Sequence, residues 1–150
     1  MKKHISVFLA LVLLVGTAIL PVHAAAPDIF PEIEVICTEY GNLEVETTLV
    51  VHDSLFRSST KSADKIQTVK LDGTVIAEVT LSATFSYDGT TARVTSASGS
   101  HTTSGGWSYK NESISKSGDT AELTANLTKL LYPTLDVEIT LSCTPSGQIS

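Results

Sequence analysis

An alternation of apolar and polar residues, interrupted only at Ile76, runs from Thr74 to Tyr87 and constrains the fold more than any other feature. Asp72-Gly73 precedes this run and Asp88-Gly89 follows it, and both dipeptides favour tight hairpin turns. Because side chains alternate between the two faces of a strand, the run predicts one long antiparallel strand between two hairpins. The apolar positions of the run are Val75, Ala77, Val79, Leu81, Ala83, Phe85 and Tyr87.

The same period of two recurs along most of the remaining chain, and no segment has a convincing helical period. Several short strands separated by turn residues predict an all-β fold, an antiparallel β-sandwich of about 7–8 strands. Immunoglobulin-like and jelly-roll-like topologies both stay open. The other alternating segments lie near Glu32–Thr38, Leu43–Val51, Ile66–Leu71, Thr90–Ser98, Trp107–Ser115, Ala121–Leu127 and Thr134–Cys143.

Three stretches lack this alternation. His52–Asp64 and Gly99–Gly106 are polar and predict surface loops. Connections on a rigid scaffold often carry recognition, so these two loops are the expected binding loops. The last residues, Thr144–Ser150, contain Pro145 and Gly147 and predict a frayed end.

The first residues, Met1–Ala24, have the pattern of a cleavable secretory signal peptide. Lys2 and Lys3 precede an apolar run of about 16 residues, and Val22-His23-Ala24 places small residues at the cleavage positions. A membrane-spanning helix needs about 20 apolar residues, so this run predicts export rather than a retained anchor. Residues 25–150 are then one secreted domain, extracellular and without membrane insertion after cleavage.

The charge of the chain limits its partners. The formal net charge is −6 and becomes −8 when the signal peptide, with two lysines and no acid, is removed. A negative surface repels phosphate backbones and anionic headgroups. Nucleic acid is therefore disfavoured as a partner, and the expected partner is an extracellular polymer or protein.

Cys37 and Cys143 are the only two cysteines. Each continues the apolar alternation of its segment, so both thiols are expected to point toward the same core. An oxidising exterior favours their pairing, and closing a loop of about 106 residues would stabilise the fold by roughly 4–5 kcal/mol. The alternative, a reactive or metal-binding pair, has no supporting spacing, so the sequence predicts a structural disulfide.

Candidate catalytic and metal-binding residues are few. His52-Asp53 resembles a base with its orienting acid, but no nucleophile motif accompanies it. His101 has no acidic neighbour in sequence, and two histidines with two paired cysteines supply too few ligands for a transition metal. The sequence therefore predicts a protein that is not an enzyme, with no cofactor and no metal.

Glutamates are concentrated in the first two predicted strands. Glu32 and Glu34 alternate with apolar residues, as do Glu44 and Glu46. Converging carboxylates could bind Ca²⁺, but the spacing of a calcium loop is missing. Solvent-facing sides of two strands are the preferred interpretation.

Aromatic residues are the best candidates for ligand recognition. Trp107 and Tyr109 are two residues apart on one predicted strand, and Tyr87 ends the long alternating run. Aromatic rings on such a face could stack on sugar rings. The single tryptophan could instead fill the centre of the core, as large aromatic residues often do.

Three stretches resemble a known group of proteins: Thr80–Thr90, Ser104–Tyr109 and Ser117–Leu127, together with Leu141-Ser142-Cys143. They are similar to small exported proteins of clostridia-type Gram-positive bacteria that carry no assigned activity. The resemblance covers about residues 69–147. It implies a secreted, all-β bacterial protein and transfers no functional residue.

These observations favour a non-catalytic binding module that acts outside the cell. Two alternatives stay open. An extracellular hydrolase would need a histidine, a carboxylate and a hydroxyl group close together in one cleft. A self-assembling surface component would pair through exposed edge strands.

Overall fold

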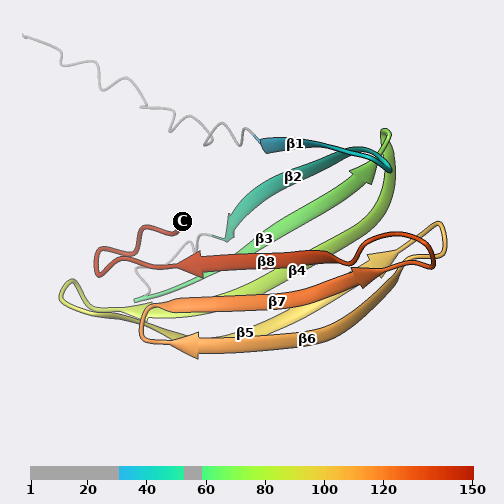
Figure 1. The fold of residues 1–150 in the computed structure, drawn as a ribbon. Helices are drawn as coiled ribbons and strands as arrows, with labels where there is room; N and C mark the ends of the chain where they lie inside the picture. Colours follow the sequence, from blue (N-terminus) through green and yellow to red (C-terminus); the bar gives the residue numbers. More distant parts are fainter. Residues whose placement is uncertain (1–30, 53–58) are drawn as a thin grey trace, which may run out of the picture.

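The computed structural model describes residues 31–52 and 59–150, and these form eight antiparallel strands in two sheets (Figure 1). The predicted signal peptide lies outside the described residues. Within them, no helix is long and apolar enough to cross a membrane. The strands are β1 (Glu32–Thr38), β2 (Gly41–His52), β3 (Thr60–Leu71), β4 (Thr74–Tyr87), β5 (Ala92–Thr103), β6 (Ser108–Ser117), β7 (Thr120–Thr128) and β8 (Leu135–Ser142).

Each sheet is a simple meander. One sheet has the order β1-β2-β3-β4-β5 and the other β6-β7-β8, so every strand pairs only with its neighbours in sequence. The all-β prediction is confirmed. The immunoglobulin-like and jelly-roll-like topologies were wrong, because both need pairing between strands that are not consecutive.

Both predicted hairpins around β4 are present. Asp72 and Gly73 have φ angles of 48° and 75°, as a type I′ turn requires. At the second turn, the carboxylate of Asp88 accepts hydrogen bonds from the backbone N–H groups of Thr90 and Thr91, at 2.8 and 2.7 Å. These bonds hold the pKa of Asp88 below its ordinary value.

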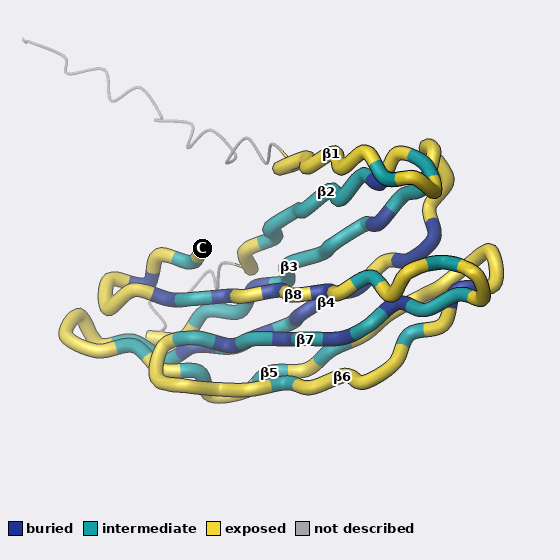
Figure 2. Tube along the Cα trace, in the orientation of Figure 1, coloured by how far each residue is buried: buried dark blue, intermediate teal, exposed yellow. Residues whose placement is uncertain are grey.

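The core lies between the inner faces of the two sheets, where strands β4, β7 and β8 face one another (Figure 2). Alternate residues of these strands are buried, as the period of two predicts, except that the adjacent Ile76 and Ala77 are both buried. The core residues on the three strands are Ile76, Ala77, Val79, Leu81, Ala83, Phe85, Ala121, Leu123, Ala125, Leu127, Val137, Ile139 and Leu141.

The smaller sheet covers only part of the larger one. Strand β8 lies over β3 and β4, whereas no Cα atom of β1 or β2, both fully described, lies within 8 Å of a Cα atom of β8. Strand β1 is exposed along nearly its whole length (Figure 2). We call this gap between β8 and β1 the open seam.

The predicted disulfide is not formed. Both cysteines are free, Cys37 exposed and Cys143 buried. The pairing of β1 with β2 places Ile36 opposite the buried Leu43, and this register turns Cys37 to the outer face. Cys143 follows the far end of β8, where burial raises the pKa of its thiol. The prediction failed because the apolar alternation of β1 marks its outer face.

The predicted loops are shorter than expected. Residues 99–103 belong to β5 and pair with β4, and β3 already begins at Thr60. The predicted frayed end also folds back: Cys143 and Ile149 form a bridge, and the N–H of Ser142 donates to the carbonyl of Ser150 at 2.9 Å. Backbone hydrogen bonds order these segments although they contain few large apolar residues.

Candidate functional site

An exposed apolar tip lies on the connection between β7 and β8. Leu130 is 86% exposed and its neighbour Leu131 is 84% exposed. Leu131 has a φ of 68°, a left-handed conformation that costs a side chain with a Cβ roughly 1–2 kcal/mol. The N–H of Tyr132 donates to the carbonyl of Lys129 at 3.1 Å and closes the turn. We call Leu130 and Leu131 the leucine tip.

Aromatic rings from three connections meet beside this tip. The ring centroids of Trp107 and Tyr132 are 5.4 Å apart, and those of Tyr132 and Tyr40 are 5.6 Å apart. The Nζ atom of Lys129 lies 4.9 Å from the centroid of Tyr132, within cation–π range. This aromatic cluster ties the tip to the rest of the fold.

Trp107 is the buried base of the cluster. It is 5% exposed and belongs to the core. Its indole Nε1 is buried and has no hydrogen-bond partner among the described residues. A buried ring without a polar partner acts here as a packing anchor, so the core alternative for Trp107 holds.

The structure does not bring the three predicted ligand-binding aromatics together. Tyr87 ends β4, whereas Trp107 lies near the beginning of that strand, because the N–H of Ser104 donates to the carbonyl of Ile76. At its own end of β4, Tyr87 lies against Gly147. Tyr109 is half-buried on β6. These residues therefore form no shared stacking surface.

Tyr109 instead joins the two sheets. Its ring stacks on His101 of β5 with centroids 3.8 Å apart, and its hydroxyl donates to Glu112 Oε2 at 2.9 Å. Burial, and then Glu112, raise the pKa of Tyr109. A backbone hydrogen bond of 2.9 Å from Val94 to Gly118 also crosses here. We call this junction of β5 and β6 the closed seam.

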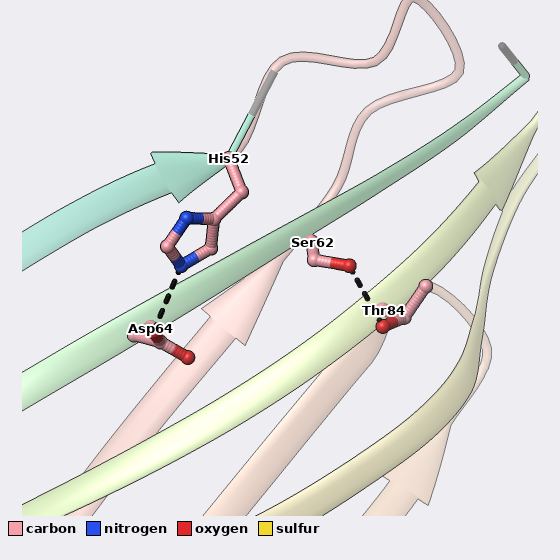
Figure 3. A network of polar contacts seen from close by, with 4 residues as sticks. All are labelled: His52, Ser62, Asp64 and Thr84. Carbon is pink, nitrogen blue, oxygen red and sulfur yellow. Dashed lines mark hydrogen bonds and ion pairs between the residues drawn. The ribbon is translucent and has the colours of Figure 1, made fainter. Parts of the chain in front are cut away.

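His52 meets a carboxylate, but not the predicted one. Its Nε2 atom lies 2.8 Å from Asp64 Oδ2 on the outer face of β3 (Figure 3). The pKa of Asp64 is lowered, first by a hydrogen bond from Ser82 and then by His52. The neighbouring hydroxyl of Ser62 pairs with Thr84 at 2.9 Å. Asp53, the predicted partner, lies outside the described residues.

The glutamates of the first two strands separate into two groups. Glu44 and Glu46 lie on the outer face, where Glu46 accepts a hydrogen bond from Lys70 at 2.7 Å. Glu32 and Glu34 turn to the inner face and line the open seam, where both stay exposed to solvent as expected. The described residues contain no group of three or more metal-ligating side chains.

Sequence reasoning missed the leucine tip and two rings of the aromatic cluster. The available signal was Lys129-Leu130-Leu131-Tyr132-Pro133, where three apolar residues stand together in a connection. A period-two pattern treats such a run only as an interruption of the strands. Consecutive apolar residues outside a strand are the better indicator of an exposed apolar surface.

Comparison of the chain with known protein families, with curated proteins and with solved structures finds no match.

Proposed function

We propose that this protein is a non-catalytic binding module that acts outside the cell and binds through the leucine tip. The proposal includes export by the signal peptide and kinship with the small exported bacterial proteins that the chain resembles. The observation that carries it is the exposure of Leu130 and Leu131, 86% and 84%. Two adjacent leucines so open to water lose hydrophobic stabilisation that a partner surface would supply.

The surroundings of the tip support recognition rather than chance exposure. Leu131 holds a left-handed backbone, and strained residues of this kind cluster at ligand-binding positions. The aromatic cluster holds Tyr132, the residue that follows the tip, and leaves Tyr40 42% exposed at its margin. A rigid apolar knob with an aromatic margin suits an apolar surface on an extracellular polymer or protein.

Retention on extracellular material tests this proposal. The purified protein and the double variant Leu130→Ser/Leu131→Asn are incubated with cell-wall material, a glycan panel and culture proteins. Asparagine tolerates the left-handed conformation, so the fold is retained. Burying two leucines supplies several kcal/mol, so the variant should bind at least about tenfold more weakly.

A matched control removes apolar surface elsewhere. Ile33 and Val35 on the outer face of β1 are 58% and 57% exposed, and Ile33→Ser/Val35→Ser should leave retention unchanged. Failure of the unaltered protein to bind any of these materials contradicts the proposal. Equal losses in both double variants would also contradict it.

An extracellular hydrolase is the second candidate, favoured by the 2.8 Å contact between His52 and Asp64. Such a pair orients an imidazole for base catalysis when a nucleophile lies within reach. Hydrolysis of ester, glycoside or peptide substrates that His52→Ala abolishes would support this candidate. Under the binding proposal, neither the unaltered protein nor His52→Ala hydrolyses them.

A further inference from the structure

A groove follows the open seam between β8 and the first three strands. Two adjoining hollows of about 440 and 430 Å³ form it, and they share Glu34, Val45, Gln67 and Glu138. Its lining combines apolar residues, Val45 and the core residue Ile139 among them, with the polar side chains of Thr47, Lys65 and Gln67. The groove therefore exposes part of the inner faces of both sheets.

The free edge of β8 faces this groove. Because N–H and C=O groups of one residue point to the same side of an antiparallel strand, alternate residues of β8 turn their backbone groups away from β7. The carbonyl of Thr140 accepts from Lys65 Nζ at 3.0 Å, and that of Glu138 accepts from Gln67 Nε2 at 3.3 Å. Two flexible side chains thus occupy positions that a neighbouring strand would take.

The chain itself shows that this edge accepts another strand. Ser150 returns beside Ser142 and exchanges two backbone hydrogen bonds with it, at 2.9 and 3.0 Å. Figure 1 shows this C-terminal return beside the end of β8. Thr140, Glu138 and Asp136 extend the same edge of β8 on which this antiparallel pairing with Ser150 is made.

Carboxylates border the groove on both sides. Glu32 and Glu34 extend from β1, and the exposed Asp136 and Glu138 extend from β8. Lys65 is the only cation among the described residues that line the groove. Opposite charges across paired strands stabilise by about 0.2–1 kcal/mol each, so Asp136 and Glu138 on β8 favour lysine or arginine on the occupant.

We propose that the groove binds an extended segment of a partner protein, with apolar residues alternating with lysine or arginine, as an added strand on β8. The apolar side chains lie against Val45 and Ile139, and the cations lie beside Asp136 and Glu138. The backbone of the segment replaces the contacts of Lys65 and Gln67 to β8. This surface is separate from the leucine tip.

A synthetic peptide of about eight alternating valine and lysine residues, labelled for fluorescence anisotropy, tests the proposal. The protein should bind it at low salt, and binding should weaken as salt screens the carboxylates. A valine–glutamate peptide of the same length should bind at least about tenfold more weakly, because it meets like charges. Equal binding of the two peptides contradicts the assigned chemistry.

Thr140→Pro tests whether the contact is strand addition. Residue 140 turns its N–H away from β7, so proline removes a donor to the added strand but none within the sheet. Thr140→Val is the matched control and retains the donor. Thr140→Pro should lose peptide binding at least about tenfold, while circular dichroism and the melting temperature confirm its fold. Retained binding in a folded Thr140→Pro protein overturns the proposal.

Two further variants separate this site from other surfaces. Asp136→Lys/Glu138→Lys should abolish binding of the valine–lysine peptide, whereas Glu78→Lys on β4 should not affect it. Leu130→Ser/Leu131→Asn should bind the peptide as the unaltered protein does, so the two proposals fail independently. No peptide binding, combined with self-association that Thr140→Pro removes, would identify a second copy as the occupant and overturn the proposal.

Discussion

The two seams between the sheets differ, although the same meander generates both. At the closed seam, Tyr109 crosses from one sheet to stack on His101 of the other, and the bond from Val94 to Gly118 joins their backbones. At the open seam, the side chains of Lys65 and Gln67 donate hydrogen bonds to the edge of β8. Two sheets of unequal width therefore close at one side and leave a groove at the other.

Inner-face chemistry explains this difference. The inner face of β4 is apolar, and the smaller sheet covers it. On β3 the two middle inner positions are Lys65 and Gln67, between the buried Ala63 and Val69, and on β1 two inner positions are Glu32 and Glu34. Burying Glu32 and Glu34 without partners would cost several kcal/mol, so the smaller sheet stops at Lys65 and Gln67, whose side chains bond to the edge of β8.

The largest expected effect comes from truncating one apolar residue beside each seam. Leu123 is fully buried and Ile36 is 43% exposed. Leu123→Ala should lower the free energy of unfolding by about 3 kcal/mol, because it leaves a cavity. Ile36→Ala should lower it by less than about 1 kcal/mol. Urea denaturation measures both, and equal losses would show that the open seam is packed like the closed one.

A smaller effect is expected at Gly99, because the closed seam leaves no room for a side chain at this position. A Cβ atom there would lie 2.8 Å from Leu123 Cδ1 and 2.9 Å from Glu112 Oε2. Gly99→Ala should therefore destabilise the fold by about 1–3 kcal/mol. The control Ser98→Ala, on the solvent side of the same strand, should change stability by less than about 0.5 kcal/mol. A neutral Gly99→Ala variant would mean that Leu123 of β7 and Glu112 of β6 pack less closely on β5 than described.

The hydroxyl of Tyr109 contributes less. Removing its bond to Glu112 by Tyr109→Phe should cost about 1 kcal/mol near neutral pH. The raised pKa of Tyr109 means that the unfolded chain loses this proton first as pH rises above about 10. The stabilisation by the Tyr109 hydroxyl is therefore complete below about pH 10 and is lost as the pH rises further. Thermal melting across this range should show a steeper loss in the unaltered protein than in Tyr109→Phe.

The smallest effect is expected at Cys37 on the exposed strand. Cys37→Ser should change stability by less than about 0.5 kcal/mol, because the side chain packs against little. A disulfide to Cys143 would instead make this change cost roughly 4–5 kcal/mol. A thiol reagent should label Cys37 quickly in the folded protein and Cys143 only after unfolding. If neither cysteine reacted in the folded protein, the result would indicate a disulfide between Cys37 and Cys143 and contradict this prediction.

Much of the fold follows from the sequence. The alternation from Thr74 to Tyr87 marks β4, and Asp72-Gly73 marks its turn, because local chemistry determines both. The segments near Ala121–Leu127 and Thr134–Cys143 likewise match β7 and β8. These strands are covered on one face, so burial and alternation agree.

For β1, the strand that the smaller sheet does not cover, alternation predicts the wrong face as buried. In β1 the apolar residues lie outward, and a phase difference of one residue moves every side chain to the other face. The register with β2 decides which residues of β1 face inward, and the sequence of β1 alone does not reveal it. The extent of β5 was also missed, because Gly99 and His101 occupy inner positions where large apolar residues were expected.

The candidate site was predicted only in its general kind. Trp107 was recognised as a residue of either core or surface, and its neighbours decide for the core. Trp107 contacts Tyr132, which lies in a different connection between strands. Sequence spacing does not predict contacts between separate connections. The groove also depends on sheet width, which alternation does not encode.

Amide hydrogen exchange along β8 tests the central claim, the open seam, most directly. The N–H groups of Glu138 and Thr140 face the groove, whereas those of Val137 and Ile139 bond to β7. We predict that the first pair exchanges at least about 100-fold faster than the second, and that Val94 at the closed seam is protected. Equal protection of all four β8 amides would show that β8 has a partner on both sides and would contradict the account.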